Sequence, residues 1–248
     1  MSTFSYDLME DAQPKLGLIV LQSDETLERD FRRLLPASHN LLVSRIPSSV
    51  EVTPESLAAM EAHLTASAAL FPVGMKLDVV GYGCTSGTAQ IGAGRIAELT
   101  RRGKHARAVT EPVSALVAAC RALGVGRLAL LSPYVETVSD RLREVLGAAG
   151  VQTPIFGTFA EPEETKVAKI APGSLASAAR ALVADGGVNG LFLSCTNLRT
   201  LDVIGPLEAE LKMPVLSSNL VLAWHMLVLA GADDLGAPAD LLRTVPAA

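Results

Sequence analysis

We predict an α/β protein of two similar halves, each a parallel sheet covered by helices. The first observation is that short apolar runs alternate along the 248 residues with longer amphipathic stretches, a pattern typical of such sheets. The second is that a stretch of the sequence recurs 111 residues further along the chain. The composition agrees, because 49% of the residues are hydrophobic and only 4% are aromatic.

The apolar runs predict the strands. The first run, residues 16–21 (LGLIVL), predicts a buried strand, and the later runs resemble it in length and character. The later strands are predicted over residues 41–46, 77–82, 106–109, 128–131, 155–159, 188–193 and 215–216.

The stretches between the strands predict the helices. Over residues 26–35, the apolar side chains of Leu27, Phe31 and Leu34 recur on one helical face. Thr53 before Pro54 predicts another helix start, because Thr is a favoured N-cap and Pro is favoured at the first helical position. Further helices are predicted over residues 89–101 and 114–123, and from Asn219 onward.

The internal repeat aligns residues 16–35 with residues 127–146, where four of the twenty pairs are identical and most apolar positions match. The same offset aligns Cys84-Thr85 with Cys195-Thr196, each at a predicted strand end and helix start. The repeat therefore predicts two related halves with one Cys-Thr corner in each.

The last predicted strand completes the second half, so we expect the helix that follows it to return to the first half. This places the first domain at residues 15–118 and 219–248. The second domain is then residues 119–218.

Both Cys-Thr corners lie where ligands bind, because ligands of open α/β sheets sit beyond the carboxyl ends of the strands. Facing halves would bring Cys84 and Cys195 to opposite walls of one cleft. Backbone N–H groups at each helix start favour an anion. The side chains of Thr85, Ser86, Thr88, Thr196 and Asn197 add hydrogen-bond donors, so the cleft suits a carboxylate.

Two thiols on opposite faces of one carbon can take a proton from one side and deliver one from the other. A thiolate can instead add to an activated double bond. The field of the helix starts is expected to lower the pKa of Cys84 and Cys195 below the free value of about 8.5. Roles as small core residues or as a redox disulfide are the alternatives for this pair, and Cys120 is assigned to the core.

Several classes of function are disfavoured. A formal charge of −5 and a pI of about 5.4 argue against a nucleic-acid surface. The longest apolar stretch, residues 220–232, is interrupted by His225 and is short of the roughly 20 residues of a membrane span. Three cysteines and no signal-peptide pattern predict a reducing cytoplasm. No GxGxxG or P-loop pattern is present and no histidine lies beside Cys84 or Cys195, so neither a nucleotide loop nor a metal site is indicated.

The doubled strand–Cys-Thr motif, the opening GLIVLQSDET and the segment PVLSSNLVLAW resemble the aspartate/glutamate racemase superfamily. The similarity is greatest to its maleate isomerase and arylmalonate decarboxylase branch and, within that, to the ectoine-utilisation proteins. The resemblance covers residues 16–230. It implies two flavodoxin-like halves about a pseudo-twofold axis, an active site between them and chemistry without a cofactor. We also expect a homo-oligomer, a dimer or a tetramer.

The resemblance implies catalytic roles for Cys84 and Cys195, and a substrate contact for Tyr134. The decarboxylases of the branch keep only the second cysteine, so Cys84 favours racemase or isomerase chemistry. Maleate isomerases would carry Asn at the position of Asp24 and a second Asn near Glu164. These two departures argue against maleate as the substrate.

Asp24 has two interpretations. It caps the helix that follows, because Asp is a preferred N-cap, or its carboxylate binds an ammonium or N–H group of the substrate. Asn219 is expected near the cleft, and Arg199 is expected to pair with a carboxylate or with Asp202. The predicted substrate-binding residues are Asp24, Thr85, Ser86, Tyr134, Thr196, Asn197 and Asn219.

We therefore expect a cofactor-independent two-cysteine racemase or isomerase of a small carboxylate. The expected substrate is an amino acid or acylated amino acid, as in ectoine-type catabolism. The alternatives are a maleate cis–trans isomerase, an arylmalonate-type decarboxylase and a non-catalytic carboxylate-binding protein.

Overall fold

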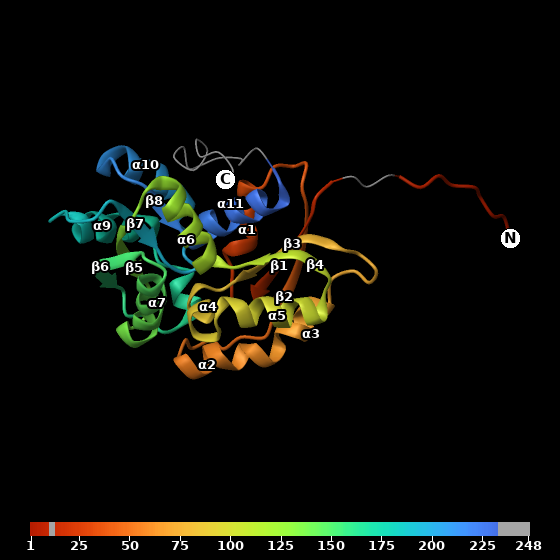
Figure 1. Ribbon diagram of the computed structural model, residues 1–248, viewed down its shortest axis with the longest axis horizontal. Coiled ribbons are helices and arrows are strands. Elements are labelled where there is room, and N and C mark those ends of the chain that lie inside the picture. The colour runs from red at the N-terminus through yellow and green to blue at the C-terminus, as the bar shows by residue number, and fades with distance from the viewer. Residues whose placement is uncertain (10–12, 233–248) are drawn as a thin grey trace.

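The computed structural model describes residues 1–9 and 13–232, which form two parallel four-stranded sheets (Figure 1). The first sheet has the order β2-β1-β3-β4, with β1 (Lys15–Leu21), β2 (Asn40–Ile46), β3 (Leu77–Gly83) and β4 (Ala106–Thr110). The second has the order β6-β5-β7-β8, with β5 (Arg127–Ser132), β6 (Gln152–Thr158), β7 (Gly190–Leu193) and β8 (Val215–Ser217). The predicted α/β fold with parallel sheets is confirmed, and the shared strand order matches the internal repeat.

Helices cover the sheets. Those of the first part of the chain are α1 (Leu27–Leu34), α2 (Pro54–Ala59), the short 3₁₀ helix η1 (Met60–His63), α3 (Leu64–Ala69), α4 (Thr85–Ile91), α5 (Ala93–Gly103) and α6 (Pro112–Leu123). Those of the second part are α7 (Glu136–Ala148), α8 (Glu164–Val167), α9 (Pro172–Val183), α10 (Leu201–Leu211) and α11 (Ser218–Ala230).

Thr53 caps α2 as expected, since its hydroxyl accepts a hydrogen bond from the backbone N–H of Ser56 at 3.1 Å. The helix expected over residues 89–101 is wrong in one respect. It is two helices, α4 and α5, because Gly92 has a φ of +94° that no α-helix accommodates.

The internal repeat also predicts the wrong local structure at the second Cys-Thr corner. In the first half, Cys84 is followed directly by α4, but Cys195 is followed by a turn, and α10 begins only at Leu201. The prediction that both corners open a helix is therefore wrong for Cys195.

The helix α11 follows the second sheet in the chain but packs against β3 and α6 of the first half (Figure 1). A Cβ atom at Gly81 of β3 would collide with Met226 of α11, so the absence of a side chain at Gly81 permits this close approach. The proposed domain division stays a prediction. Its first boundary falls inside α6, and residues 233–248 lie outside the described residues.

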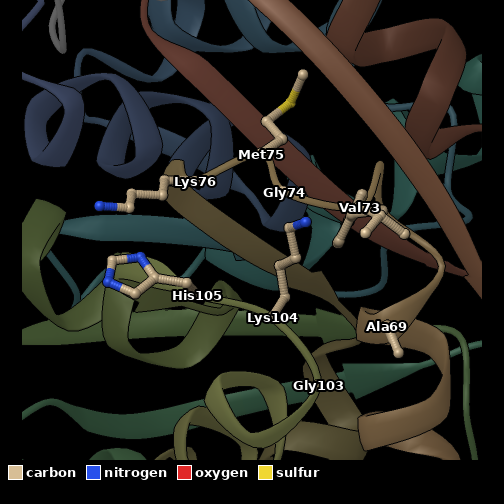
Figure 2. A pocket seen from close by; sticks show the side chains of 9 residues that line it. Ala69, Val73, Gly74, Met75, Lys76, Gly103, Lys104 and His105 are labelled. Atoms are coloured by element: carbon tan, nitrogen blue, oxygen red, sulfur yellow. The ribbon is translucent and has the colours of Figure 1, made fainter.

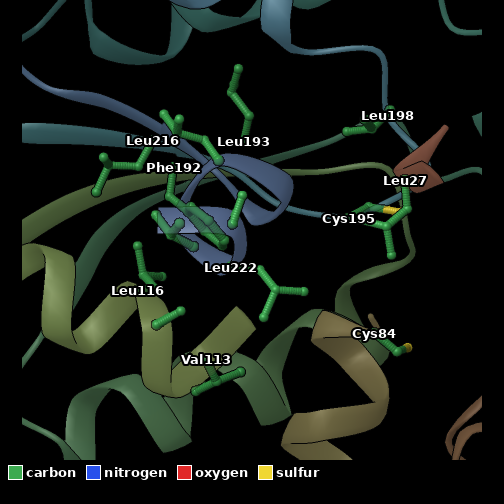
Figure 3. Packing of buried hydrophobic residues seen from close by; sticks show 14 of the residues in the cluster. Leu27, Cys84, Val113, Leu116, Phe192, Leu193, Cys195, Leu198, Leu216 and Leu222 are labelled. Atoms are coloured by element: carbon green, nitrogen blue, oxygen red, sulfur yellow. The ribbon is translucent and has the colours of Figure 1, made fainter. Parts of the chain in front are cut away.

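The central strands of both sheets are buried except at Lys15, Asp78 and Arg127, and their apolar side chains belong to one continuous cluster that spans the two halves. Figure 3 shows part of this cluster, with Cys195 beside Leu27 and Leu198 and with both cysteines away from Phe192, Leu193 and Leu216 in this view. Within residues 1–9 and 13–232, no helix has both the length and the apolar character to cross a membrane.

Candidate active site

Cys84 and Cys195 line one small, largely enclosed cavity between the two halves, with a volume of only about 10 Å³. The cavity lies beyond the carboxyl ends of β3 and β7, as predicted for ligand sites in such sheets. Its lining residues are Leu21, Leu57, Cys84, Thr85, Ser86, Tyr134, Glu164, Cys195 and Thr196. Among these described residues there is no Lys, Arg or His, so a bound anion would rely on neutral hydrogen-bond donors.

Cys84 directly follows β3 and is the N-cap of α4. Its Sγ accepts a hydrogen bond from the Gly87 N–H at 3.2 Å. Burial raises the pKa of the Cys84 thiol to about 12. The Gly87 N–H and the Tyr82 hydroxyl favour the thiolate, whereas the carboxyl groups of Glu164 and Asp24 disfavour it.

Cys195 has a φ of +109°, which is unusual for a residue with a side chain and marks a strained backbone. Contacts with α11 hold this conformation. The Cys195 N–H donates to the hydroxyl of Ser218 at 3.0 Å, and the Thr196 carbonyl accepts from the Asn219 side chain at 2.9 Å. No sequence pattern predicts the strained backbone of Cys195.

The Sγ of Cys195 lies 3.0 Å from the hydroxyl oxygen of Tyr134 and accepts a hydrogen bond from the Asn197 N–H at 3.3 Å. Burial raises the pKa of Cys195 well above its usual value, and the Glu164 carboxyl adds to that rise. Our prediction of lowered cysteine pKa values is therefore wrong for both thiols. The apolar surroundings outweigh the field of the backbone N–H groups.

Asp24 supports the start of α1, as the capping interpretation requires, although the N-cap residue itself is Thr26. Its Oδ1 accepts hydrogen bonds from the N–H groups of Thr26 and Leu27, at 2.8 Å and 2.7 Å. Its Oδ2 is buried and has no hydrogen-bond partner at ordinary distance in the described part of the chain, although the nearby Thr196 side chain lowers the pKa of this carboxyl. Burial raises the pKa of Asp24, and the N–H groups of Leu27 and Thr26 oppose that rise.

Glu164 is a site residue that our sequence analysis noted only as a departure from the family pattern. It opens α8, its side chain lines the cavity, and its N–H donates to the Val50 carbonyl of the first half at 2.9 Å. Its Oε1 accepts from the Tyr134 hydroxyl at 2.5 Å and its Oε2 from the Asn197 side chain at 2.8 Å. Burial raises the pKa of Glu164.

Other predicted residues divide into two groups. Thr85, Ser86, Tyr134 and Thr196 line the cavity with the cysteines. Asp24, Asn197 and Asn219 lie behind it. Asn219 donates to the buried Asp30 carboxylate at 2.8 Å, so it supports the turn after Cys195 rather than the cavity wall.

Three further predictions concern residues outside the cavity. Cys120 is a buried core residue of α6, as expected. Thr88 donates to the Cys84 carbonyl at 2.6 Å. Arg199 is exposed, and the pairing with Asp202 is wrong because Asp202 pairs with Arg33 of α1 at 2.6 Å.

A second hollow lies at the other end of the first sheet, beside the amino ends of β3 and β4 (Figure 2). Its lining includes Lys76, Lys104 and His105 and none of the predicted site residues. In the described ranges, no cluster of three or more His, Cys, Asp or Glu side chains could hold a metal ion.

Gly87 offers a test of the packing around Cys84. A Cβ at Gly87 would lie 2.8 Å from the Cys84 Sγ and 2.8 Å from the Tyr82 hydroxyl. We expect Gly87→Ala to lower the free energy of unfolding by roughly 1–3 kcal/mol in urea titrations, as overpacking does. The exposed Gly94 of α5 has open space, so Gly94→Ala should raise it by about 0.4–1 kcal/mol. Equal midpoints for the two variants would contradict a tight fit at Cys84.

Comparisons with known proteins agree with this fold. The family model described as arylmalonate decarboxylase matches residues 91–241. The chain is 28% identical to the maleate isomerase of Nocardia farcinica over 224 residues, covering 86% of this chain and 88% of that one. It is also 28% identical to the arylmalonate decarboxylase of Bordetella bronchiseptica over 239 residues, covering 93% and 96%.

A solved structure of a Nocardia farcinica maleate cis–trans isomerase mutant, with a covalently bound succinylcysteine intermediate, superimposes with a TM-score of 0.83. It is 25% identical and the match covers 95% of this chain and all (100%) of that one. The expected resemblance to this branch is confirmed. The link to ectoine-utilisation proteins stays a prediction.

Proposed function

Because the chain belongs to the arylmalonate decarboxylase family, we propose that it is an isomerase of a small carboxylate that acts through Cys84 and Cys195 without a cofactor. The observation that supports this most is the single cavity lined by both thiols. The similar proteins are maleate isomerases and an arylmalonate decarboxylase, which supports both an enzyme and a small carboxylate substrate. A homo-oligomer and a cytoplasmic location remain predictions.

The comparisons favour the alternatives of maleate isomerisation and arylmalonate-type decarboxylation over the amino-acid racemisation that we expected first. In cis–trans isomerisation, one cysteine as thiolate forms a sulfur–carbon bond with the alkene while the adjacent carbon takes a proton from the other thiol. Rotation about the new single bond, return of that proton and cleavage of the sulfur–carbon bond give the trans product and the original thiolate.

The raised pKa values of the two thiols bear on how the reactive thiolate forms. Burial raises the pKa of Cys84 to about 12, so the neutral thiol is the favoured form of this residue in the empty site near neutral pH. Thiolate formation at Cys84 would therefore accompany substrate binding. The Ser86 hydroxyl lines the same cavity and would donate a hydrogen bond to the carboxylate. The hydroxyls of Thr85 and Thr196 already donate to the Ser218 hydroxyl and the Gly83 carbonyl, so they would have to turn to do the same.

Racemisation of a carboxylate that carries an N–H group is a second candidate, favoured by one carboxyl group that lines the cavity and a second that lies behind it. Glu164 lines it, and the buried Oδ2 of Asp24 lacks a partner among the described residues. A dicarboxylate would meet like charge in a poorly solvated site, which is costly, whereas an ammonium or amide group would be attracted. The two thiols would then exchange the α-proton on opposite faces.

One panel of compounds in D₂O, followed by NMR, separates these functions. It should contain maleate, an arylmalonate, amino acids and N-acyl amino acids, with a Cys84→Ser/Cys195→Ser variant as the matched control. Appearance of a trans alkene, loss of CO₂ or loss of the α-proton each identifies one reaction. Ligand binding with no conversion of any compound would overturn the enzyme and leave a carboxylate-binding protein.

A further inference from the structure

Three buried side chains from separate segments form a hydrogen-bonded chain that ends on the Cys195 sulfur. The Tyr134 hydroxyl oxygen lies 2.5 Å from the Glu164 Oε1 and 3.0 Å from the Cys195 Sγ. The exposed fractions of Tyr134, Glu164 and Cys195 are 4%, 4% and 5%. Tyr134 follows β5, Glu164 opens α8 and Cys195 follows β7, so the tertiary fold alone brings them together.

The chemistry of the three groups fixes the direction of their hydrogen bonds. In the ionised form of Glu164 the carboxylate only accepts, so the Tyr134 hydroxyl then donates its single proton to Glu164. The phenol oxygen is then left to accept from the S–H of Cys195. The hydrogen bonds therefore run from the Cys195 thiol through the Tyr134 phenol to the Glu164 carboxylate, and both donated protons point towards Glu164.

We propose that Glu164 accepts the proton of Cys195 through Tyr134, and thereby generates the Cys195 thiolate of the proposed reaction. The S–H bond of Cys195 breaks as the proton passes to the phenol oxygen, and the phenol proton passes to the Oε1 of Glu164. The reverse transfer restores the thiol. The inference rests on the proposed function. Because Glu164 acts on Cys195 through Tyr134, it is a positioning residue for Cys195.

The charge of the cavity explains why an internal acceptor is needed. Loss of the Cys195 proton to bulk water would leave a thiolate beside the carboxyl groups of Glu164 and Asp24, and both raise the pKa of Cys195. Transfer to Glu164 moves the negative charge to sulfur without adding a second charge to the buried cluster. The titratable groups that face Glu164 from the surrounding elements are Tyr134, Cys195, Cys84 and Asp24.

Glu164 is held for this role from both halves. Its backbone N–H donates to the Val50 carbonyl at 2.9 Å, and the Asn197 amide donates to its Oε2 at 2.8 Å. The Asn197 Oδ1 in turn accepts from the Glu25 N–H at 2.9 Å. The Oε1 is therefore fixed towards Tyr134, and Glu164→Gln can keep that contact through its amide oxygen while losing the ability to accept a proton.

The pH dependence of Cys195 alkylation tests the proposal without any substrate. In a Cys84→Ser/Cys120→Ser background, Cys195 is the sole thiol of the chain, and iodoacetamide reacts only with its thiolate. When Glu164 holds the proton, the reactive form has the same number of protons as the resting form. The alkylation rate should then be independent of pH across a plateau above the pKa of Glu164.

With Glu164→Gln or Tyr134→Phe in the same background, the proton must leave to solvent, and the rate should rise about tenfold per pH unit. Glu163→Gln, which changes a half-buried neighbour paired with Lys166, is the matched control and should keep the plateau. A tenfold rise per unit with Glu164 present would overturn the proposal. A plateau that persists in Tyr134→Phe would remove Tyr134 from the path and overturn it in this form.

Turnover measurements with the otherwise native chain separate the proposal from the proposed function. Glu164→Gln should lower kcat on the order of 10²–10⁴-fold with a much smaller change in KM, and the loss should shrink as the pH rises. A loss that is the same at every pH would indicate a merely structural Glu164 and overturn the proposal. A plateau in alkylation together with no turnover of any compound would leave the relay standing and overturn the enzyme.

Discussion

Replacing either Cys84 or Cys195 by serine is expected to reduce turnover on the order of 10²–10⁴-fold or more, since each thiol transfers a proton or adds to the substrate. Each side chain is small and buried, and serine keeps the shape of cysteine, so the fold should remain. Because the two thiols act as a unit, the double substitution should cost little more than either single one. Steady-state kinetics and circular dichroism measure the two effects.

The residue Cys120 supplies the control for this result. It lies in the core of α6 and does not line the cavity, so Cys120→Ser should change stability and leave turnover intact. If the reaction is racemisation, each single variant should retain exchange of the α-proton for one enantiomer. Full activity in both single variants would contradict the two-cysteine mechanism, and activity that requires an oxidant would favour a disulfide.

The substitution Asp24→Asn should weaken the binding of an amino-acid ligand on the order of 1–3 kcal/mol, because a charge-assisted hydrogen bond becomes a neutral one. It should improve the binding of a dicarboxylate, because repulsion by the carboxylate disappears. The amide oxygen can still accept from the N–H groups of Thr26 and Leu27, so the helix cap should persist.

Calorimetric titration of one amino acid and one dicarboxylate against both forms distinguishes the two roles of Asp24. Shifts of opposite sign would support a role in substrate choice through the unpartnered Oδ2. Parallel shifts, or none, would leave Asp24 as a helix cap and return maleate as a substrate. Urea unfolding of the same two proteins should give equal midpoints in either case.

The strands could be predicted from the sequence because a buried parallel strand is a short apolar run, and every predicted run overlaps an observed strand. The break at Gly92 could not, since a glycine inside a helical pattern is often tolerated. The repeat located Cys84 and Cys195 but suggested the same local structure for both. The turn after Cys195 depends on contacts with Ser218 and Asn219, which no local pattern reveals.

The carboxyl at position 164 was missed as a site residue for a similar reason. Glu164 stands in an acidic run, EPEET, that is typical of an exposed loop, and Tyr134 is 30 residues away. The cysteine pKa values were mispredicted because the positive end of a helix can be read from sequence, whereas the depth of burial cannot. The family resemblance identified these positions, and only the fold shows that they meet.

The return of α11 to the first sheet has a consequence for how the chain is synthesised. The strands of the first sheet end at Thr110, but the helix that packs on β3 begins only at Ser218. At roughly 5–20 residues per second, a ribosome needs on the order of 5–20 s to make the intervening segment. Throughout that interval the face of β3 around Gly81 is not yet covered by α11. The half that emerges first is therefore the last to be completed, and the nascent chain presents this apolar face to chaperones until α11 arrives.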